Sequence, residues 1–190
     1  MYEVIWHGRG GQGVVIASQI LAESAYLQGF KGVTSAPTFG PERRGAPLTA
    51  STRISDTPIR TFSQINKADI AVVLDPSLLA IVDILGSLKP NGLLLINTPQ
   101  KADEVQVTGC CGIATLDAGS IAMRFGLLKE GTPMVNTPML GVLSKASGLV
   151  SLEYLEKGLE WKLSGEAATA NIAAVRAAYE ETSLKTTAAN

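Results

Sequence analysis

Apolar residues recur along this chain in two alternating patterns, one with the period of a strand and one with the period of a helix. Residues 3–7 alternate and end directly at a glycine, which predicts a strand, and apolar positions at helical spacing predict a helix over 14–27. The run DIAVVLD at 69–75 is continuous and aliphatic, as in a strand that helices bury on both faces. The same criteria predict strands at 33–36, 48–55, 93–97 and 113–116, and helices at 77–85, 120–128, 139–147, 151–163 and 167–180.

This order of elements predicts an α/β protein. Strands that alternate with helices favour a Rossmann-like, doubly wound, mostly parallel sheet with helices on both faces. No strand pattern follows Asn136, so we expect a helical C-terminal part. Since no linker or internal repeat interrupts the chain, we expect one domain over residues 1–183 and a frayed tail over 184–190.

Composition narrows the classes of partner. Of the 190 residues, 46% are hydrophobic and 17% are charged, with a net charge of -1, so the chain has material for a core but no broad basic surface for nucleic acid. The apolar runs are too short to span a bilayer and no signal peptide precedes them, so we expect a cytoplasmic protein without a membrane anchor. Cys110 and Cys111 are adjacent and cannot supply the spaced thiolates of a zinc or iron-sulfur site, so we expect buried thiols and no metal.

The segment GRGGQG, from Gly8 to Gly13, fits the G-x-G-x-x-G pattern at the turn between the first strand and the first helix. Backbone N–H groups at such a turn can hold a phosphate. A dinucleotide enzyme should also present an acidic residue at the end of its second strand, but that strand reads VTSA at 33–36, which argues against NAD. Arg9 and Gln12 are not needed for a tight turn and are candidates for contacting a ligand or a partner chain. For His7 two roles stay open: capping loop carbonyls, or direct contact with a substrate or an interface.

Two further segments carry polar groups. The loop TFGPERRGAP at 38–47 is stiffened by proline. Its Arg43 and Arg44 either bind a phosphate or carboxylate, or pair internally with Glu42, or belong to a solvated loop. In the segment NTPMLG, beginning at Asn136, the ordinary interpretation is capping of the following helix by Asn136 or Thr137. We find no nucleophile beside a base, no phosphate-loop lysine and no carboxylate pair, so no catalytic residue is assigned.

Taken together, VIWHGRGGQG, FGPERRGAP and NTPMLG resemble the gamma subunit, or gamma domain, of the 2-oxoacid:ferredoxin oxidoreductases. The three motifs match in order and spacing over nearly the whole chain. The length and the loop FGPERRGAP are most similar to the pyruvate and 2-oxoisovalerate enzymes, and the 2-oxoglutarate and indolepyruvate enzymes come next.

The resemblance implies a multi-subunit enzyme that converts a 2-oxoacid, coenzyme A and oxidised ferredoxin to acyl-CoA, carbon dioxide and reduced ferredoxin. Alpha and beta subunits would hold thiamine diphosphate and Mg²⁺, a ferredoxin-like delta subunit would hold [4Fe-4S] clusters, and this chain would hold none of them. Its implied role is to pack against those subunits and to meet coenzyme A. The residues expected to contact coenzyme A or a partner are Gly8, Arg9, Gly10, Gly11, Gln12, Gly13, Arg43 and Arg44. Two alternatives stay open: a free-standing NAD(P)-binding oxidoreductase, and a purely structural interaction subunit.

Overall fold

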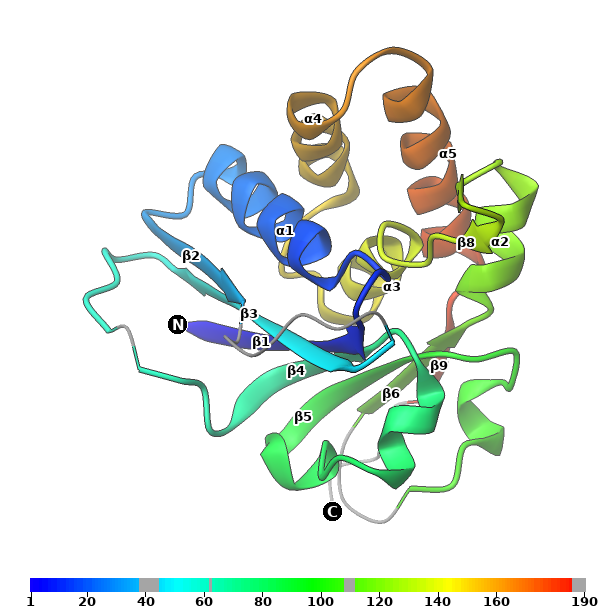
Figure 1. Cartoon of the computed structure of the whole chain (residues 1–190). Helices are drawn as coiled ribbons and strands as arrows, with labels where there is room; N and C mark the ends of the chain where they lie inside the picture. Colours follow the sequence, from blue (N-terminus) through cyan, green and yellow to red (C-terminus); the bar gives the residue numbers. More distant parts are fainter. Residues whose placement is uncertain (38–44, 62, 108–111, 186–190) are drawn as a thin grey trace.

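The computed structural model describes residues 1–37, 45–61, 63–107 and 112–185, which form nine strands, five α-helices and three 3-10 helices in that described part (Figure 1). The strands are β1 (Tyr2–Arg9), β2 (Gly32–Pro37), β3 (Pro47–Ser55), β4 (Ala68–Val73), β5 (Leu88–Asn97), β6 (Gly112–Leu116), β7 (Leu128–Lys129), β8 (Thr132–Pro133) and β9 (Ser183–Lys185). The α-helices are α1 (Val14–Gln28), α2 (Ala118–Arg124), α3 (Pro138–Ser147), α4 (Leu152–Lys162) and α5 (Gly165–Glu181). The 3-10 helices are η1 (Pro76–Ala80), η2 (Leu85–Ser87) and η3 (Ala102–Glu104).

Seven of the strands form one sheet in the order β2-β3-β1-β4-β5-β6-β9. Its centre is parallel, because β1 pairs with β4, β4 with β5 and β5 with β6 in the same direction. The strands β2 and β3 at one side of the sheet and β9 at the other run antiparallel to their neighbours. The predicted Rossmann-like α/β fold and its helical C-terminal part are therefore confirmed, with antiparallel strands added at both edges.

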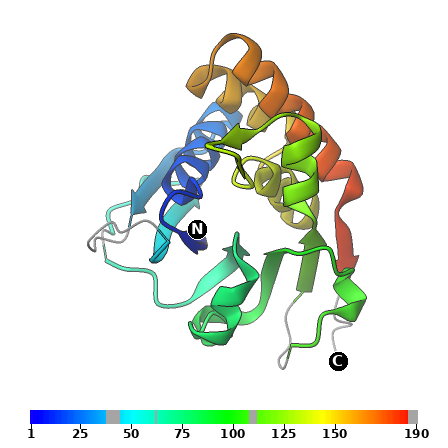
Figure 2. The ribbon, with the colours of Figure 1, turned by 45° about the vertical axis from the view of Figure 1, so that its right-hand side comes forward.

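Alternate residues of the central strands serve two separate cores. In β4, Ile70 and Val72 face the core beneath α1, α3, α4 and α5, whereas Ala71 and Val73 face a second core on the other side of the sheet. Figures 1 and 2 show the α-helices gathered over the first face. A strand that is apolar on both sides is buried on both sides, as its continuous aliphatic run predicted.

The second face is covered differently from the prediction. The helix expected over 77–85 is wrong, because η1 ends at Ala80 and a separate turn leads into η2. Leu78 and Ile84 are both buried against the sheet, and a spacing of six residues does not place them on one face of an α-helix. Two short turns bring both side chains to the sheet, and the Asp83 carboxylate accepts a hydrogen bond from the Gly86 N–H at 2.8 Å to fix the second turn.

The expectation of no strand after Asn136 is also wrong. Ser183, Leu184 and Lys185 form β9 and pair antiparallel with β6, while residues 186–190 lie outside the described residues. The pairing satisfies backbone groups at the edge of β6 that would otherwise be open. The Ser183 hydroxyl also accepts a hydrogen bond from the Ala102 N–H at 3.1 Å. The hairpin β7–β8 was missed, since the helix predicted to reach Leu128 ends at Arg124.

Candidate functional site: the glycine loop

The glycine loop, residues 8–13, lies at the edge of the sheet where the parallel strands end. From β1 the chain crosses through α1 to β2 on one side, whereas β4 and β5 extend the sheet on the other side. The junction between β1 and β4 is therefore a topological switch point, the place where open α/β sheets commonly bind ligands. The loop sits directly above that junction.

Two of the four loop glycines are required by close approach. Gly13 has a φ of 75°, and a Cβ at this position would lie 2.5 Å from the Asn136 Nδ2 atom. A Cβ on Gly8 would lie 2.6 Å from the Val14 Cγ2 atom at the start of α1. The glycines thus allow the loop to pack tightly against α1 and against the segment before α3.

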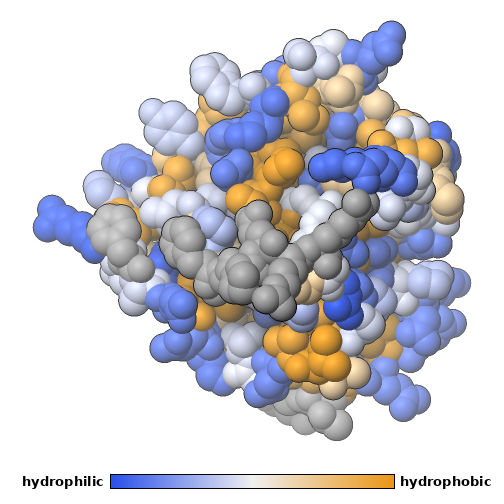
Figure 3. Space-filling view, in the orientation of Figure 1, coloured by the Kyte–Doolittle hydropathy of each residue, from blue (hydrophilic) through white to orange (hydrophobic). Residues whose placement is uncertain are grey.

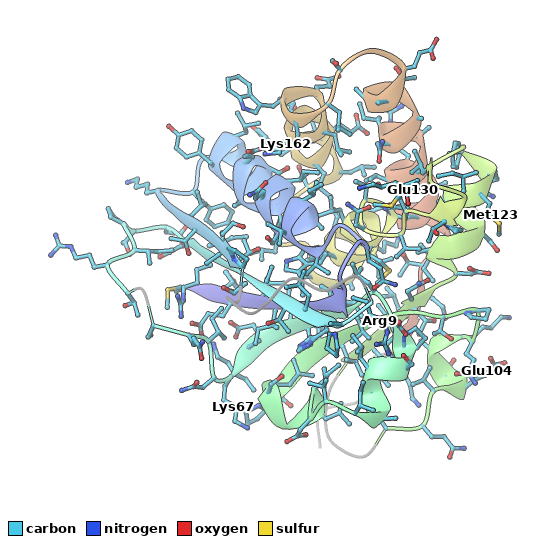
Figure 4. All side chains as sticks on the ribbon, viewed as in Figure 1. Arg9, Lys67, Glu104, Met123, Glu130 and Lys162 are labelled. Atoms are coloured by element: carbon cyan, nitrogen blue, oxygen red, sulfur yellow. The ribbon has the colours of Figure 1, made fainter. Side chains whose placement is uncertain are left out.

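Arg9 and Gln12 turn inward rather than outward. The Gln12 Oε1 atom accepts a hydrogen bond from the Arg9 N–H at 2.7 Å, and the Gln12 N–H donates to the Arg9 carbonyl at 3.0 Å. The Arg9 guanidinium donates from Nε to the Asp75 Oδ2 atom at 2.6 Å, from Nη2 to the Ser77 Oγ atom at 2.8 Å and from Nη1 to the Gly45 carbonyl at 3.0 Å. Figure 4 labels Arg9 between the end of β1 and η1. Both side chains are committed to the protein itself.

The Asp75 carboxylate is the acidic half of this arrangement. Partial burial acts to raise its pKa, but hydrogen bonds from Ser77 and Arg9 and the charge of Arg9 outweigh burial and hold the pKa below its usual value. The carboxylate also accepts a hydrogen bond from the Ser77 N–H at 3.0 Å and so caps η1. Asp75 is thus ionised at neutral pH and neutralises Arg9.

Several backbone N–H groups of the loop and of the start of α1 have no hydrogen-bond partner among the described residues. Among the described residues, those of Gly11, Gly13 and Val14 to Ile16 donate no hydrogen bond. Helix α1 begins at Val14 with Gly13 as its N-cap residue, so it has no side-chain cap, and no acidic residue lies in its first turn. The partial positive charge of a helix N-terminus stabilises a nearby anion by about 0.3–1 kcal/mol. The loop therefore offers backbone donors to an anion, and its side-chain cation Arg9 is already paired with Asp75.

The segment before α3 supports the loop instead of capping a helix. The predicted capping by Asn136 or Thr137 is wrong, because α3 begins at Pro138 without a side-chain cap. The Asn136 Nδ2 atom donates to the Gly13 carbonyl at 3.3 Å, and the Thr137 hydroxyl lies 2.5 Å from the Asn171 Oδ1 atom. Asn136 is 4% exposed, so its amide fills the space that a side chain at position 13 would need. The GRGGQG and NTPMLG motifs thus form one unit.

His7 lies one residue before the loop and faces away from α1. It is 4% exposed, and its Nε2 atom makes no hydrogen bond with a described residue. Burial lowers the pKa of His7 from 6.5 to about 4, so the ring is neutral at pH 7. It therefore adds no positive charge to an anion site.

Some of the other predicted residues lie outside the part of the chain that the structure describes. Arg43 and Arg44 lie outside the described residues, as do Cys110 and Cys111. The adjoining segment joins the loop, because the Gly10 N–H donates to the Ala46 carbonyl at 2.9 Å and the Gly45 N–H to the Gly10 carbonyl at 3.2 Å.

Sequence reasoning missed two residues that hold this edge together. Asp75 pairs with Arg9, and Asn97 donates to the Leu74 carbonyl at 2.9 Å while accepting from the Ala118 N–H at 3.0 Å. The signal was present, since each polar residue directly ends an aliphatic strand. Among the described residues no group of three or more His, Cys, Asp or Glu is placed to hold a metal ion, and none of the described helices has the length and hydropathy of a membrane span.

A groove of about 620 Å³ opens at the opposite edge of the sheet, where β1, β4 and β5 begin. Lys89 in its wall forms ion pairs with Glu3 at 3.2 Å and with Asp69 at 2.9 Å. The groove is thus separate from the glycine loop.

Fold and loop together define an α/β protein of Rossmann type whose switch point carries a glycine-rich, anion-compatible turn. The family described as pyruvate ferredoxin/flavodoxin oxidoreductase matches residues 3–181, and the chain belongs to this family. The family predicted from the three sequence motifs is confirmed.

Relatives and solved structures agree over the full length. The chain is 46% identical to the "Pyruvate/ketoisovalerate oxidoreductases common subunit gamma" of Pyrococcus furiosus, covering 97% of this chain and 98% of the relative. It is 40% identical to the "NADH-dependent phenylglyoxylate dehydrogenase subunit gamma" of Aromatoleum evansii, covering 97% and 95%. The structure of a pyruvate oxidoreductase subunit from Thermotoga maritima matches with a TM-score of 0.80 at 37% identity, covering 96% and 97%.

Proposed function

We propose that this chain is the gamma subunit of a 2-oxoacid:ferredoxin oxidoreductase that acts on pyruvate or 2-oxoisovalerate. The observation that carries the proposal is the full-length similarity to gamma subunits of such enzymes. The complex converts the 2-oxoacid, coenzyme A and oxidised ferredoxin to acyl-CoA, carbon dioxide and reduced ferredoxin. Alpha and beta subunits with thiamine diphosphate and Mg²⁺, and a delta subunit with [4Fe-4S] clusters, supply the redox chemistry.

The role proposed for this chain is assembly together with a contact to coenzyme A at the glycine loop. Coenzyme A carries phosphates, and the open N–H groups at the start of α1 suit such an anion. Arg43 and Arg44 follow in the adjoining segment and would supply the positive charge that Arg9 does not offer.

Exposed apolar residues support assembly. Figure 3 shows hydrophobic side chains at the surface above and below the grey atoms. In the described part of the chain, Ile81 is 61% exposed, and Tyr26 on α1 and Trp161 on α4 are 65% and 79% exposed. Large aromatic residues are enriched at protein interfaces, so these residues fit a chain that works inside a larger complex.

Purification from the native source under anaerobic conditions tests the main proposal. Three further chains should co-purify with this one, and the complex should reduce ferredoxin with pyruvate or 2-oxoisovalerate in preference to other 2-oxoacids. A chain that purifies alone, or a complex inactive on every 2-oxoacid of the panel, would contradict it.

Coenzyme A contact is tested separately in the assembled complex. Hydrogen exchange at residues 8–16 should slow when coenzyme A is added, and replacing Arg43 and Arg44 by alanine should raise the KM for coenzyme A. Arg60→Ala is the matched control, an exposed arginine between β3 and β4. Unchanged exchange and an unchanged KM would leave a purely structural interaction subunit as the better description.

The sheet order argues against the NAD(P)-binding alternative. A dinucleotide site needs an acidic side chain, or an arginine for a ribose phosphate, at the end of the strand that follows the first crossover helix. Here β2 ends at Ala36 and Pro37, and β3 separates β2 from β1. Titration of the full chain with nicotinamide nucleotides should show no saturable binding, and tight saturable binding would overturn this conclusion.

A further inference from the structure

We propose that Arg9 is a positioning residue that fixes the glycine loop, so that the loop meets its anion through backbone N–H groups alone. The proposal rests on the proposed function insofar as the anion is a phosphate of coenzyme A. It reverses the expectation that Arg9 itself contacts the ligand.

The guanidinium joins three separate segments. Asp75 follows β4, Ser77 belongs to η1, and Gly45 precedes β3, and each accepts one of the hydrogen bonds described above. The Arg9 side chain is 29% exposed and that of Asp75 20%, so the pair is largely shielded from water. A planar fork that donates in three directions is a property of arginine that lysine does not share.

The backbone of the same residues completes the clamp. Arg9 is closed against Gln12 in both directions, and Gly10 is paired through its N–H and its carbonyl with the segment Gly45–Ala46. The loop is therefore held at Arg9 and Gly10, while the N–H groups of Gly11, of Gly13 and of Val14 to Ile16 carry no hydrogen bond to a described residue. Fixing the first part of the loop sets the direction of these open donors.

The charge of Arg9 is used within the protein. Its Nε atom lies 2.6 Å from the Asp75 carboxylate, so the pair is neutral as seen from the loop. Removing Arg9 would loosen the loop and would also leave an unpaired carboxylate near an anion. These two effects are separable, because removal of Asp75 as well restores neutrality but not the clamp.

Four variants of the full chain test the clamp. Arg9→Ala should speed hydrogen exchange at residues 8–16 and 45–46 without any ligand, and in the assembled complex should raise the KM for coenzyme A roughly ten- to a hundredfold with little change in kcat. Arg9→Lys should show exchange rates and a KM for coenzyme A that lie between those of wild type and those of Arg9→Ala. The double variant Arg9→Ala/Asp75→Ala should keep a raised KM for coenzyme A. Arg53→Ala is the matched control, since it breaks the Arg53–Glu3 ion pair of 3.0 Å at the opposite end of β1 and should move neither readout.

The outcomes separate the clamp from the proposed function. Unchanged exchange in Arg9→Ala overturns the clamp. A wild-type KM in Arg9→Lys or in the double variant shows that charge alone matters, which also overturns it. Faster loop exchange in Arg9→Ala with an unchanged KM supports the clamp and refutes the coenzyme A contact.

Discussion

Substitution of Gly13 by alanine is the sharpest test of how the glycine loop is built. At a φ of 75° an L-residue costs about 1–2 kcal/mol relative to glycine. The added Cβ would also lie 2.5 Å from the Asn136 Nδ2 atom and 2.8 Å from its Cγ atom, so the buried amide must move. Losing its hydrogen bond to the Gly13 carbonyl costs about 1 kcal/mol more, and displacement of a packed side chain adds about 1 kcal/mol. We expect a total near 3–4 kcal/mol.

Gly11→Ala is the matched control for this prediction. Gly11 also has a positive φ, 99°, but a Cβ there would meet no atom within 4 Å. Its substitution carries the backbone cost without the clash, and both alanines restrict the unfolded chain equally, by about 0.4–1 kcal/mol. The difference between the two variants therefore isolates the contact with Asn136, about 2 kcal/mol.

Urea unfolding of the two full-length variants, followed by circular dichroism, measures this difference. For a chain of this size 2 kcal/mol corresponds to about 4–8 °C in Tm. Asn136→Gly should recover part of the loss in Gly13→Ala and none in Gly11→Ala. The close-packing account is refuted if Gly13→Ala is no less stable than Gly11→Ala, or if Asn136→Gly rescues both equally.

Three further outcomes follow from the same structure. Burial lowers the pKa of His7 from 6.5 to about 4, so as the pH falls the unfolded chain binds a proton at His7 before the folded chain does. Up to about 3 kcal/mol of stability should therefore be lost between pH 6.5 and about 4. The variant His7→Gln does not titrate there and should lose correspondingly less stability over the same pH range. Gly141→Ala in α3 should destabilise the chain by about 1–3 kcal/mol although alanine favours helices, since its Cβ would strike the Val175 carbonyl of α5; a gain in Tm would contradict that packing. Ser183→Ala should cost about 1–2 kcal/mol in urea unfolding, because the buried Ala102 N–H loses its acceptor, and an unchanged midpoint would show that this hydrogen bond adds nothing to stability.

Strand and helix positions could be read from the sequence wherever local pattern and burial agree. The run at 69–75 predicted a strand buried on both faces, and β4 is apolar toward both cores. The helix predicted over 77–85 is wrong, because the spacing of apolar residues there suits two turns as well as one helix. Packing against the sheet favours the two turns. The strand β9 was missed for a related reason. Three residues are too few to show a hydrophobic period, and they form a strand because they pair with the open edge of β6.

By itself the sequence determined the α/β class, the position of the glycine loop and the family, because each depends on residues that are adjacent or nearly so along the chain. Tertiary structure decided what the loop residues do. Arg9 and Asp75 are 66 positions apart, and Asn136 lies 123 positions from Gly13. No local pattern could therefore show that Arg9 pairs with Asp75, or that Asn136 packs against the glycine at position 13. Arg9 and Gln12, which the sequence presents as free for a ligand, are hydrogen-bonded within the fold, since a largely shielded charge or amide is costly without a partner.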